Sequence, residues 1–99
     1  MNNNREMLSK LLNAVMLDNS GTVKELIEKG VSINSYEDKY KERPLHFALT
    51  YNAYESAKEL LSGGADMDAK SIDDITPFEI ASQHKNKKMV ELFERYRSC

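Results

Sequence analysis

Residues 43–48 of the chain read RPLHFA, and residues 60–68 read LLSGGADMD. The first segment returns as TPFEIA at residues 76–81, so that Pro77 follows Pro44 at a distance of 33 residues. At an offset of 34 residues in the other direction, LLNA at 11–14 corresponds to LHFA at 45–48, and EKGVSIN at 28–34 corresponds to SGGADMD at 62–68. Two independent landmarks agree on one phase, which indicates an internal repeat of 33 to 34 residues.

Within each period the apolar residues recur at steps of three and four, which predicts a pair of helices. We expect the first helix at about residues 4–18. The second should end at Gly30, and its counterpart in the next period at Gly63-Gly64, because glycine readily takes the left-handed conformation that closes a helix. The core residues predicted from this pattern are Leu8, Leu11, Leu12, Val15, Val23, Leu26, Ile27, Leu45, Ala48, Leu49, Ala57, Leu60, Leu61, Met89, Val90 and Phe93.

Short-range signals mark where these helices start and turn. Pro44 suits the first position of a helix, where its missing N–H is not needed. Thr76 and Glu79 have the spacing of a capping box, in which each side chain bonds to the backbone N–H of the other residue. Asn52 and Lys85 occupy the same position between the two helices of their periods. We expect a left-handed backbone at both residues.

The repeat resembles the ankyrin repeat, whose signature is Thr-Pro-Leu-His-x-Ala with a period of about 33 residues. Residues 43–48 depart from that signature only at Arg43, which replaces the threonine. The residue before a helix is preferentially Thr, Ser, Asp or Asn, since these side chains accept a hydrogen bond from the first turn. We therefore expect Arg43→Thr to raise the free energy of unfolding by roughly 0.5 to 1.5 kcal/mol.

The resemblance implies an all-α fold, an ankyrin-repeat solenoid of helix-turn-helix units with projecting hairpin-like finger loops. It implies a single domain over residues 1–99, with repeat 1 at about 5–35 as an N-terminal cap, repeat 2 at about 39–71, and repeat 3 at about 72–99 as a C-terminal cap. Glu94 stands where repeat 2 has Leu61, and such a polar residue suits a terminal repeat that no neighbour covers. We expect the protein to be complete with these three repeats.

Composition and charge limit the classes of partner. The chain has 99 residues and a net charge of −2, which argues against nucleic-acid binding, since that draws most of its affinity from clustered Lys and Arg. The basic run KNKK at 85–88 is interpreted as a solvated turn in preference to a contact with phosphate or an acidic partner. The N-terminal residues lack the apolar core of a signal peptide, and Cys99 is the only cysteine. We expect a cytoplasmic monomer that does not bind membranes.

Residues that could serve catalysis or bind a metal are better explained by structural roles. The resemblance assigns His46 to holding the turn at the start of a helix, and His84 has no second ligand at metal-binding spacing. The four aspartates within residues 66–74 do not follow the spacing of an EF-hand loop. A glycine-rich phosphate loop and a nucleophile elbow are also missing from the sequence. We expect no cofactor, no metal and no enzymatic activity.

The resemblance places partner-binding positions on the fingers and on the exposed side of each first helix, which together form a concave face. Six of these positions hold large apolar or aromatic residues, and we expect Tyr40 and Tyr51 to be the anchors because tyrosine is common at binding hot spots. The alternative is that the loops bury four of these side chains, namely Met16, Leu17, Ile72 and Ile75. The positions are Met16, Leu17, Lys39, Tyr40, Glu42, Thr50, Tyr51, Ile72, Asp73, Ile75, Gln83 and His84.

The function hypothesis is a non-enzymatic protein–protein interaction module that binds a protein partner through the concave face and the finger loops. The alternative hypothesis is a dedicated inhibitor or immunity-type protein that occludes a single partner enzyme.

Overall fold

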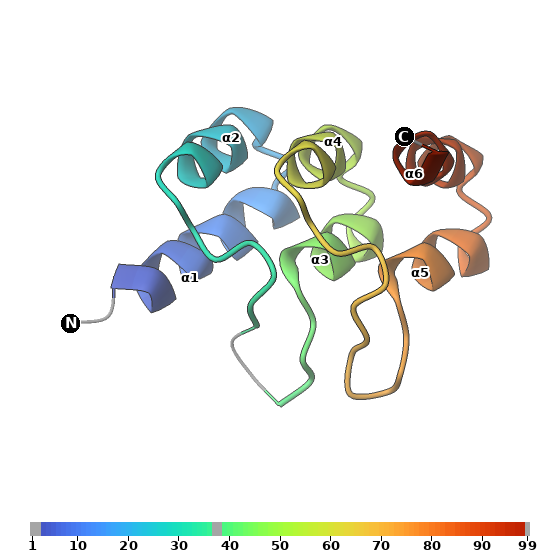
Figure 1. The fold of residues 1–99 in the computed structure, drawn as a ribbon, viewed down its shortest axis with the longest axis horizontal. Coiled ribbons are helices and arrows are strands. Elements are labelled where there is room, and N and C mark those ends of the chain that lie inside the picture. The colour runs from blue at the N-terminus through green and yellow to red at the C-terminus, as the bar shows by residue number, and fades with distance from the viewer. Residues whose placement is uncertain (1–2, 37–38, 99) are drawn as a thin grey trace.

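A computed structural model describes residues 3–36 and 39–98, and this part of the chain contains six α-helices and no strands. Figure 1 shows α1, α3 and α5 in one layer and α2, α4 and α6 in a second layer beside it. The all-α repeat fold predicted from the sequence is confirmed. The helices are α1 (Asn3–Met16), α2 (Ser20–Glu28), α3 (Pro44–Thr50), α4 (Tyr54–Ser62), α5 (Pro77–Gln83) and α6 (Lys87–Ser98).

The helices pack first within pairs and then between pairs. Helix α1 packs on α2, α3 on α4 and α5 on α6, and each pair also packs on the next along the chain. Long loops join α2 to α3 and α4 to α5, and both project from the same side of the stack (Figure 1). The result is an elongated molecule of 40 × 28 × 24 Å.

The hydrophobic core runs through all three helix pairs. Ala14, Ala48 and Ala81 hold the same repeat position and are 5%, 0% and 1% exposed, since neighbouring first helices approach closely there. The core residues predicted from the apolar spacing are buried, except that Ile27 and Val90 are half-buried. Leu92, which the pattern did not identify, is buried as well.

The turns within the helix pairs use a left-handed backbone. Asp18, Asn52 and Lys85 hold the same repeat position and have φ of 52°, 57° and 54°, which confirms the expectation for the latter two. The second helices are followed by Gly30 and Gly64, at φ of 90° and 97°, as predicted from the glycine positions.

Two of the turn residues also join successive repeats. Asp18 accepts a hydrogen bond at Oδ1 from the backbone N–H of Ser56 at 2.9 Å. Asn52 accepts at Oδ1 from the side-chain amide of Asn86 at 2.6 Å. The same turn therefore closes a helix pair and fixes the next pair against it.

Candidate functional site

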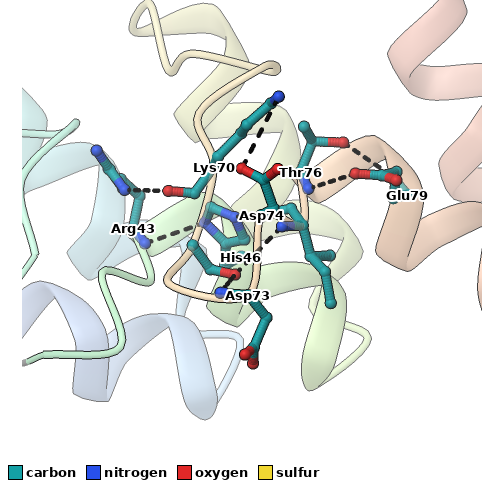
Figure 2. Close-up of polar contacts among 9 residues, drawn as sticks. Arg43, His46, Lys70, Asp73, Asp74, Thr76 and Glu79 are labelled. Carbon is teal, nitrogen blue, oxygen red and sulfur yellow. Dashed lines mark hydrogen bonds and ion pairs between the residues drawn. The ribbon is translucent and has the colours of Figure 1, made fainter.

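The start of α3 is held by the buried side chain of His46. Its Nδ1 accepts a hydrogen bond from the backbone N–H of Arg43 at 3.0 Å (Figure 2), and its Nε2 lies 2.8 Å from the carbonyl oxygen of Ile75. Because Nδ1 is an acceptor, Nε2 carries the proton and donates to Ile75. Burial lowers the pKa of His46 below its ordinary value of 6.5, although the bond to Ile75 acts in the opposite direction. The neutral ring thus has the structural role that the resemblance implied.

Arg43 makes contacts with three separate segments of backbone. Its guanidinium donates to the carbonyl oxygens of Asn34 at 3.3 Å and Lys41 at 2.6 Å. It also donates to the carbonyl oxygen of Lys70 at 2.8 Å (Figure 2). It also lies over the ring of Tyr36, 4.7 Å from the centroid. Threonine could make none of these contacts. Arg43 is the N-cap of α3 and its side chain makes no cap hydrogen bond, as the sequence predicted. The contacts of its guanidinium, however, argue against the expectation that Arg43→Thr stabilises the fold, because the substitution would remove them.

The start of α5 has the capping box predicted from the sequence. The backbone N–H of Glu79 donates to Oγ1 of Thr76 at 3.2 Å, and the backbone N–H of Thr76 donates to Oε1 of Glu79 at 2.9 Å (Figure 2). Glu79 stands at the position of His46 in the previous repeat. Two different side chains thus satisfy the backbone at equivalent helix starts.

The two projecting loops are linked by hydrogen bonds, and this brings several predicted site residues together. The backbone N–H of Ile72 donates to the carbonyl oxygen of Tyr40 at 2.8 Å, so these two residues are neighbours although 32 positions separate them. Their side chains are 52% and 51% exposed. The ammonium of Lys39 lies 5.5 Å from the centre of the Tyr40 ring. The finger group, as we call it, consists of Lys39, Tyr40, Glu42, Ile72, Asp73 and Ile75.

The other predicted site residues lie where the first helices end. Thr50 is the last residue of α3 and Tyr51 is its C-cap, and the ring of Tyr51 stacks on that of Phe47 with centroids 6.3 Å apart. His84 is the C-cap of α5, one residue beyond the helix on which the sequence placed it. Leu17 follows α1 directly and is 79% exposed. The helix-end group consists of Met16, Leu17, Thr50, Tyr51, Gln83 and His84.

The two groups lie at opposite ends of the first helices. Tyr40 is in the loop that leads into α3, whereas Tyr51 closes α3 at its other end. A helix of 7 residues is about 10 Å long. The two tyrosines proposed as anchors therefore belong to separate parts of the surface.

Three of the four aspartates within residues 66–74 make contacts through their carboxylates. Asp66 accepts at Oδ1 from the backbone N–H of Asp68 at 2.9 Å, and Asp68 pairs with Arg97 at 3.2 Å. Asp74 lies 3.9 Å from the ammonium of Lys70 (Figure 2). Among the described residues, no group of three or more His, Cys, Asp or Glu side chains could hold a metal ion. In the same residues we find no helix with the length and apolar character needed to cross a membrane.

Comparison with known proteins identifies the family. A family model for ankyrin repeats in three copies matches residues 1–71. The chain belongs to the ankyrin repeat family. Ankyrin repeats generally mediate protein–protein interaction, and the family is typically non-enzymatic.

Named relatives share these repeats with the chain. The chain is 37% identical over 73 residues to the 2-5A-dependent ribonuclease of Mus musculus. The aligned region covers 74% of this chain and 10% of the ribonuclease. The chain is also 35% identical over 71 residues to an I-Kappa-B like protein of Microplitis demolitor bracovirus. That aligned region covers 71% of this chain and 39% of the viral protein. A putative ankyrin repeat protein of fowlpox virus is 48% identical over 54 residues, or 52% of this chain and 10% of the viral protein. The chain thus spans only a minor part of each relative.

The ankyrin scaffold also exposes residues that the sequence did not single out. Tyr36 is 43% exposed in the first finger loop, and Phe47 is half-buried beside Tyr51 on α3. Phe47 occupies the variable position of the ankyrin signature, a signal that could have added it to the candidates. Met16 and Ile75 are half-buried, which agrees only in part with the alternative interpretation that the loops bury these residues, whereas Leu17 and Ile72 are exposed.

Proposed function

We propose that this ankyrin-repeat chain is a non-enzymatic, cytoplasmic module that binds a protein partner through its finger group and its helix-end group. The supporting observation is the exposure of apolar side chains that the core does not use. Of the five large hydrophobic side chains that are exposed among the described residues, four belong to the two groups: Leu17, Tyr40, Tyr51 and Ile72. Exposed apolar patches on a folded protein are often functional, and tyrosine is enriched at binding hot spots.

The way the loops are held supports this role. The contacts of Arg43 with Lys70, of His46 with Ile75 and of Ile72 with Tyr40 all cross between the loops or from a loop to α3. A loop that is already ordered loses less conformational entropy when it binds. The finger group is therefore presented on a preorganised surface.

The separation of the two tyrosines allows each group to be tested alone. Tyr40→Ala probes the finger group, and Tyr51→Ala probes the helix-end group. Truncation of a hot-spot residue costs about 2 kcal/mol or more, so the double variant should bind a purified partner at least about a hundredfold more weakly. Its far-UV circular dichroism and melting temperature should stay close to wild type, because both side chains are about half exposed.

The partner would be obtained by affinity purification with the wild-type chain and both single variants as baits. Lys24→Ala is the control, since Lys24 is exposed on α2, in the other helix layer. Equal loss of the partner from Lys24→Ala and from the tyrosine variants would refute the assignment of the surface. A single captured enzyme whose activity falls would indicate a dedicated inhibitor, whereas several partners would indicate an adaptor.

A further inference from the structure

The second helices of the three repeats meet through different residues. At Gly63, which closes α4, an added Cβ would lie 3.1 Å from Cγ2 of Ile27 and 3.2 Å from Cδ1 of Ile33. One period later the same position is Tyr96 on α6, whose hydroxyl lies 2.7 Å from Oγ of Ser62. Glycine thus permits close contact with repeat 1 where a tyrosine side chain would not fit. At the junction of α4 and α6, by contrast, a large ring stands between the helices.

An open groove of about 230 Å³ lies at this junction. Its lining residues are Lys58 from α4 and Leu92, Arg95 and Tyr96 from α6. Leu92 is only 2% exposed, so the groove reaches down to the hydrophobic core. Apolar material therefore lies at the floor, and positive charge lies at the rim.

Three cations contact Tyr54, and two of them, Lys58 and Arg95, also line the groove. The ammonium groups of Lys88 and Lys58 lie 4.2 Å and 5.9 Å from the centre of the Tyr54 ring. Arg95 donates from Nη2 to the Tyr54 hydroxyl at 3.2 Å. Lys58 also lies 3.7 Å from a carboxylate oxygen of Glu55, with both side chains exposed. Exposed ion pairs of this kind contribute little, so Glu55 can give way to another carboxylate.

The concentration of positive charge is not a general property of the chain or of its repeats. The whole chain has a net charge of −2. In repeat 2, the positions of Leu92 and Arg95 are held by Glu59 and Ser62. The carboxylates of α6 are Glu91 and Glu94, and the residues that line the groove include neither of them. The charged side chains of the lining are therefore both cations.

The helix dipole of α6 does not favour its lysines either. The first turn of α6 contains Lys87 and Lys88 and no acidic residue. Lysine near a helix N-terminus is unfavourable, because the helix dipole is positive there. Of the basic run interpreted from the sequence as a solvated turn, Lys88 lies over the ring of Tyr54, which Lys58 of the groove lining also approaches.

We propose that the groove between α4 and α6, with Lys58, Lys88 and Arg95 around an apolar floor, is a second docking site that takes an acidic peptide segment carrying an apolar side chain. The carboxylates would pair with the three cations while the apolar side chain enters the groove over Leu92. Single-stranded nucleic acid fits less well. The ring of Tyr54 already has ammonium groups near it and is not open for stacking by a base, and three cations neutralise few phosphates.

Fluorescence anisotropy tests this proposal with a short fluorescein-labelled peptide of glutamates with leucine at its centre. We expect the peptide to bind at low salt and to weaken as salt is raised, since salt screens exposed charges. The variant Lys58→Glu with Lys88→Glu should weaken binding about tenfold or more, because each change replaces attraction by repulsion. In NMR spectra, the peptide should shift amide signals of α4 and α6 and leave those of the finger group unchanged.

Matched controls distinguish binding in this groove from a general effect of charge. Lys24→Glu is the same change at the same repeat position as Lys58, but on α2, and it should leave binding of the peptide intact. The variant Lys58→Gln with Lys88→Gln neutralises the two charges without reversing them. It should also weaken binding of the peptide, and it replaces the glutamate variant if the charge reversal unfolds the chain. The proposal is overturned if the peptide does not bind, if Lys24→Glu weakens it equally, or if single-stranded oligothymidylate binds more tightly than the peptide.

Discussion

The imidazole of His46 donates from Nε2 to the carbonyl oxygen of Ile75 at 2.8 Å, across 29 residues of sequence. This hydrogen bond connects the first helix of repeat 2 with the finger loop that leads into repeat 3. The ring must be neutral to accept at Nδ1 from Arg43 at the same time. Protonation of one buried side chain would therefore disturb a helix start and a finger loop together.

The stability of the fold should fall as the pH is lowered through the titration range of this histidine. Burial lowers the pKa of His46 in the folded state below 6.5, so the unfolded chain binds more protons over that range. The contribution of the neutral His46 ring to the free energy of unfolding is complete above pH 6.5. It decreases as the pH falls towards the pKa of His46 in the folded state. Urea denaturation measured at several pH values between about 7 and 5 should show this decrease, before most carboxylates titrate.

His46→Gln should lower the free energy of unfolding and flatten its dependence on pH in that range. His84→Gln, at the exposed C-cap of α5, is the matched control and should keep the wild-type dependence. If both variants retain the decrease, another group is responsible for it.

Arg43→Thr should destabilise the fold. The substitution removes hydrogen bonds to three backbone segments and the contact with Tyr36, whereas a threonine cap returns about 1 kcal/mol. We expect a net decrease of roughly 1 kcal/mol in the free energy of unfolding, measured by urea denaturation. Arg43→Lys keeps the charge but loses the forked donor, and it should fall between wild type and Arg43→Thr. A rise in stability with threonine would mean that the guanidinium contacts contribute nothing.

Lys85→Gly should stabilise the last repeat by up to about 1 kcal/mol, because Lys85 has a φ of 54° that is costly for a residue with a Cβ. A thermal melt is sufficient to detect this change. Asn52→Gly is the comparison, since Asn52 has φ of 57° but also accepts a hydrogen bond from Asn86. The increase in stability of Asn52→Gly should be smaller than that of Lys85→Gly, or the variant should be destabilised. Equal gains at both positions would show that the bond to Asn86 has no net effect on stability.

Ser56→Ala should raise the free energy of unfolding by up to about 1 kcal/mol. Ser56 is fully buried, and within the described residues its Oγ has no hydrogen-bond partner, which is a costly state for a hydroxyl group. Alanine removes the hydroxyl and keeps the backbone bond to Asp18. Ser62→Ala on the same helix is the control, and it should give no gain because the Ser62 hydroxyl bonds to Tyr96. A loss of stability in Ser56→Ala would reveal a partner for the hydroxyl.

The sequence predicted those features that depend on neighbouring residues or on the repeat period. The left-handed backbone at Lys85 and the capping box of Thr76 and Glu79 are local, so the residues and their spacing are sufficient to predict them. The burial of Ala48 follows from the repeat, since every repeat packs in the same way. The residues of the candidate surface could be named in the same manner, because equivalent positions recur with the period.

Contacts that break the repeat could be found only in the tertiary structure. Arg43 is a poor helix cap when only its neighbours in sequence are considered. It contributes to the fold through a hydrogen bond to the backbone of Lys70, 27 residues away. The candidate surface divides in two because α3 separates Tyr40 from Tyr51, while a hydrogen bond joins Tyr40 to Ile72. The groove beside Tyr96 lies where one repeat has a tyrosine and the previous one has glycine. The periodic pattern determined the scaffold by itself, but a side chain that meets residues of another repeat acquires its role only when the repeats are stacked.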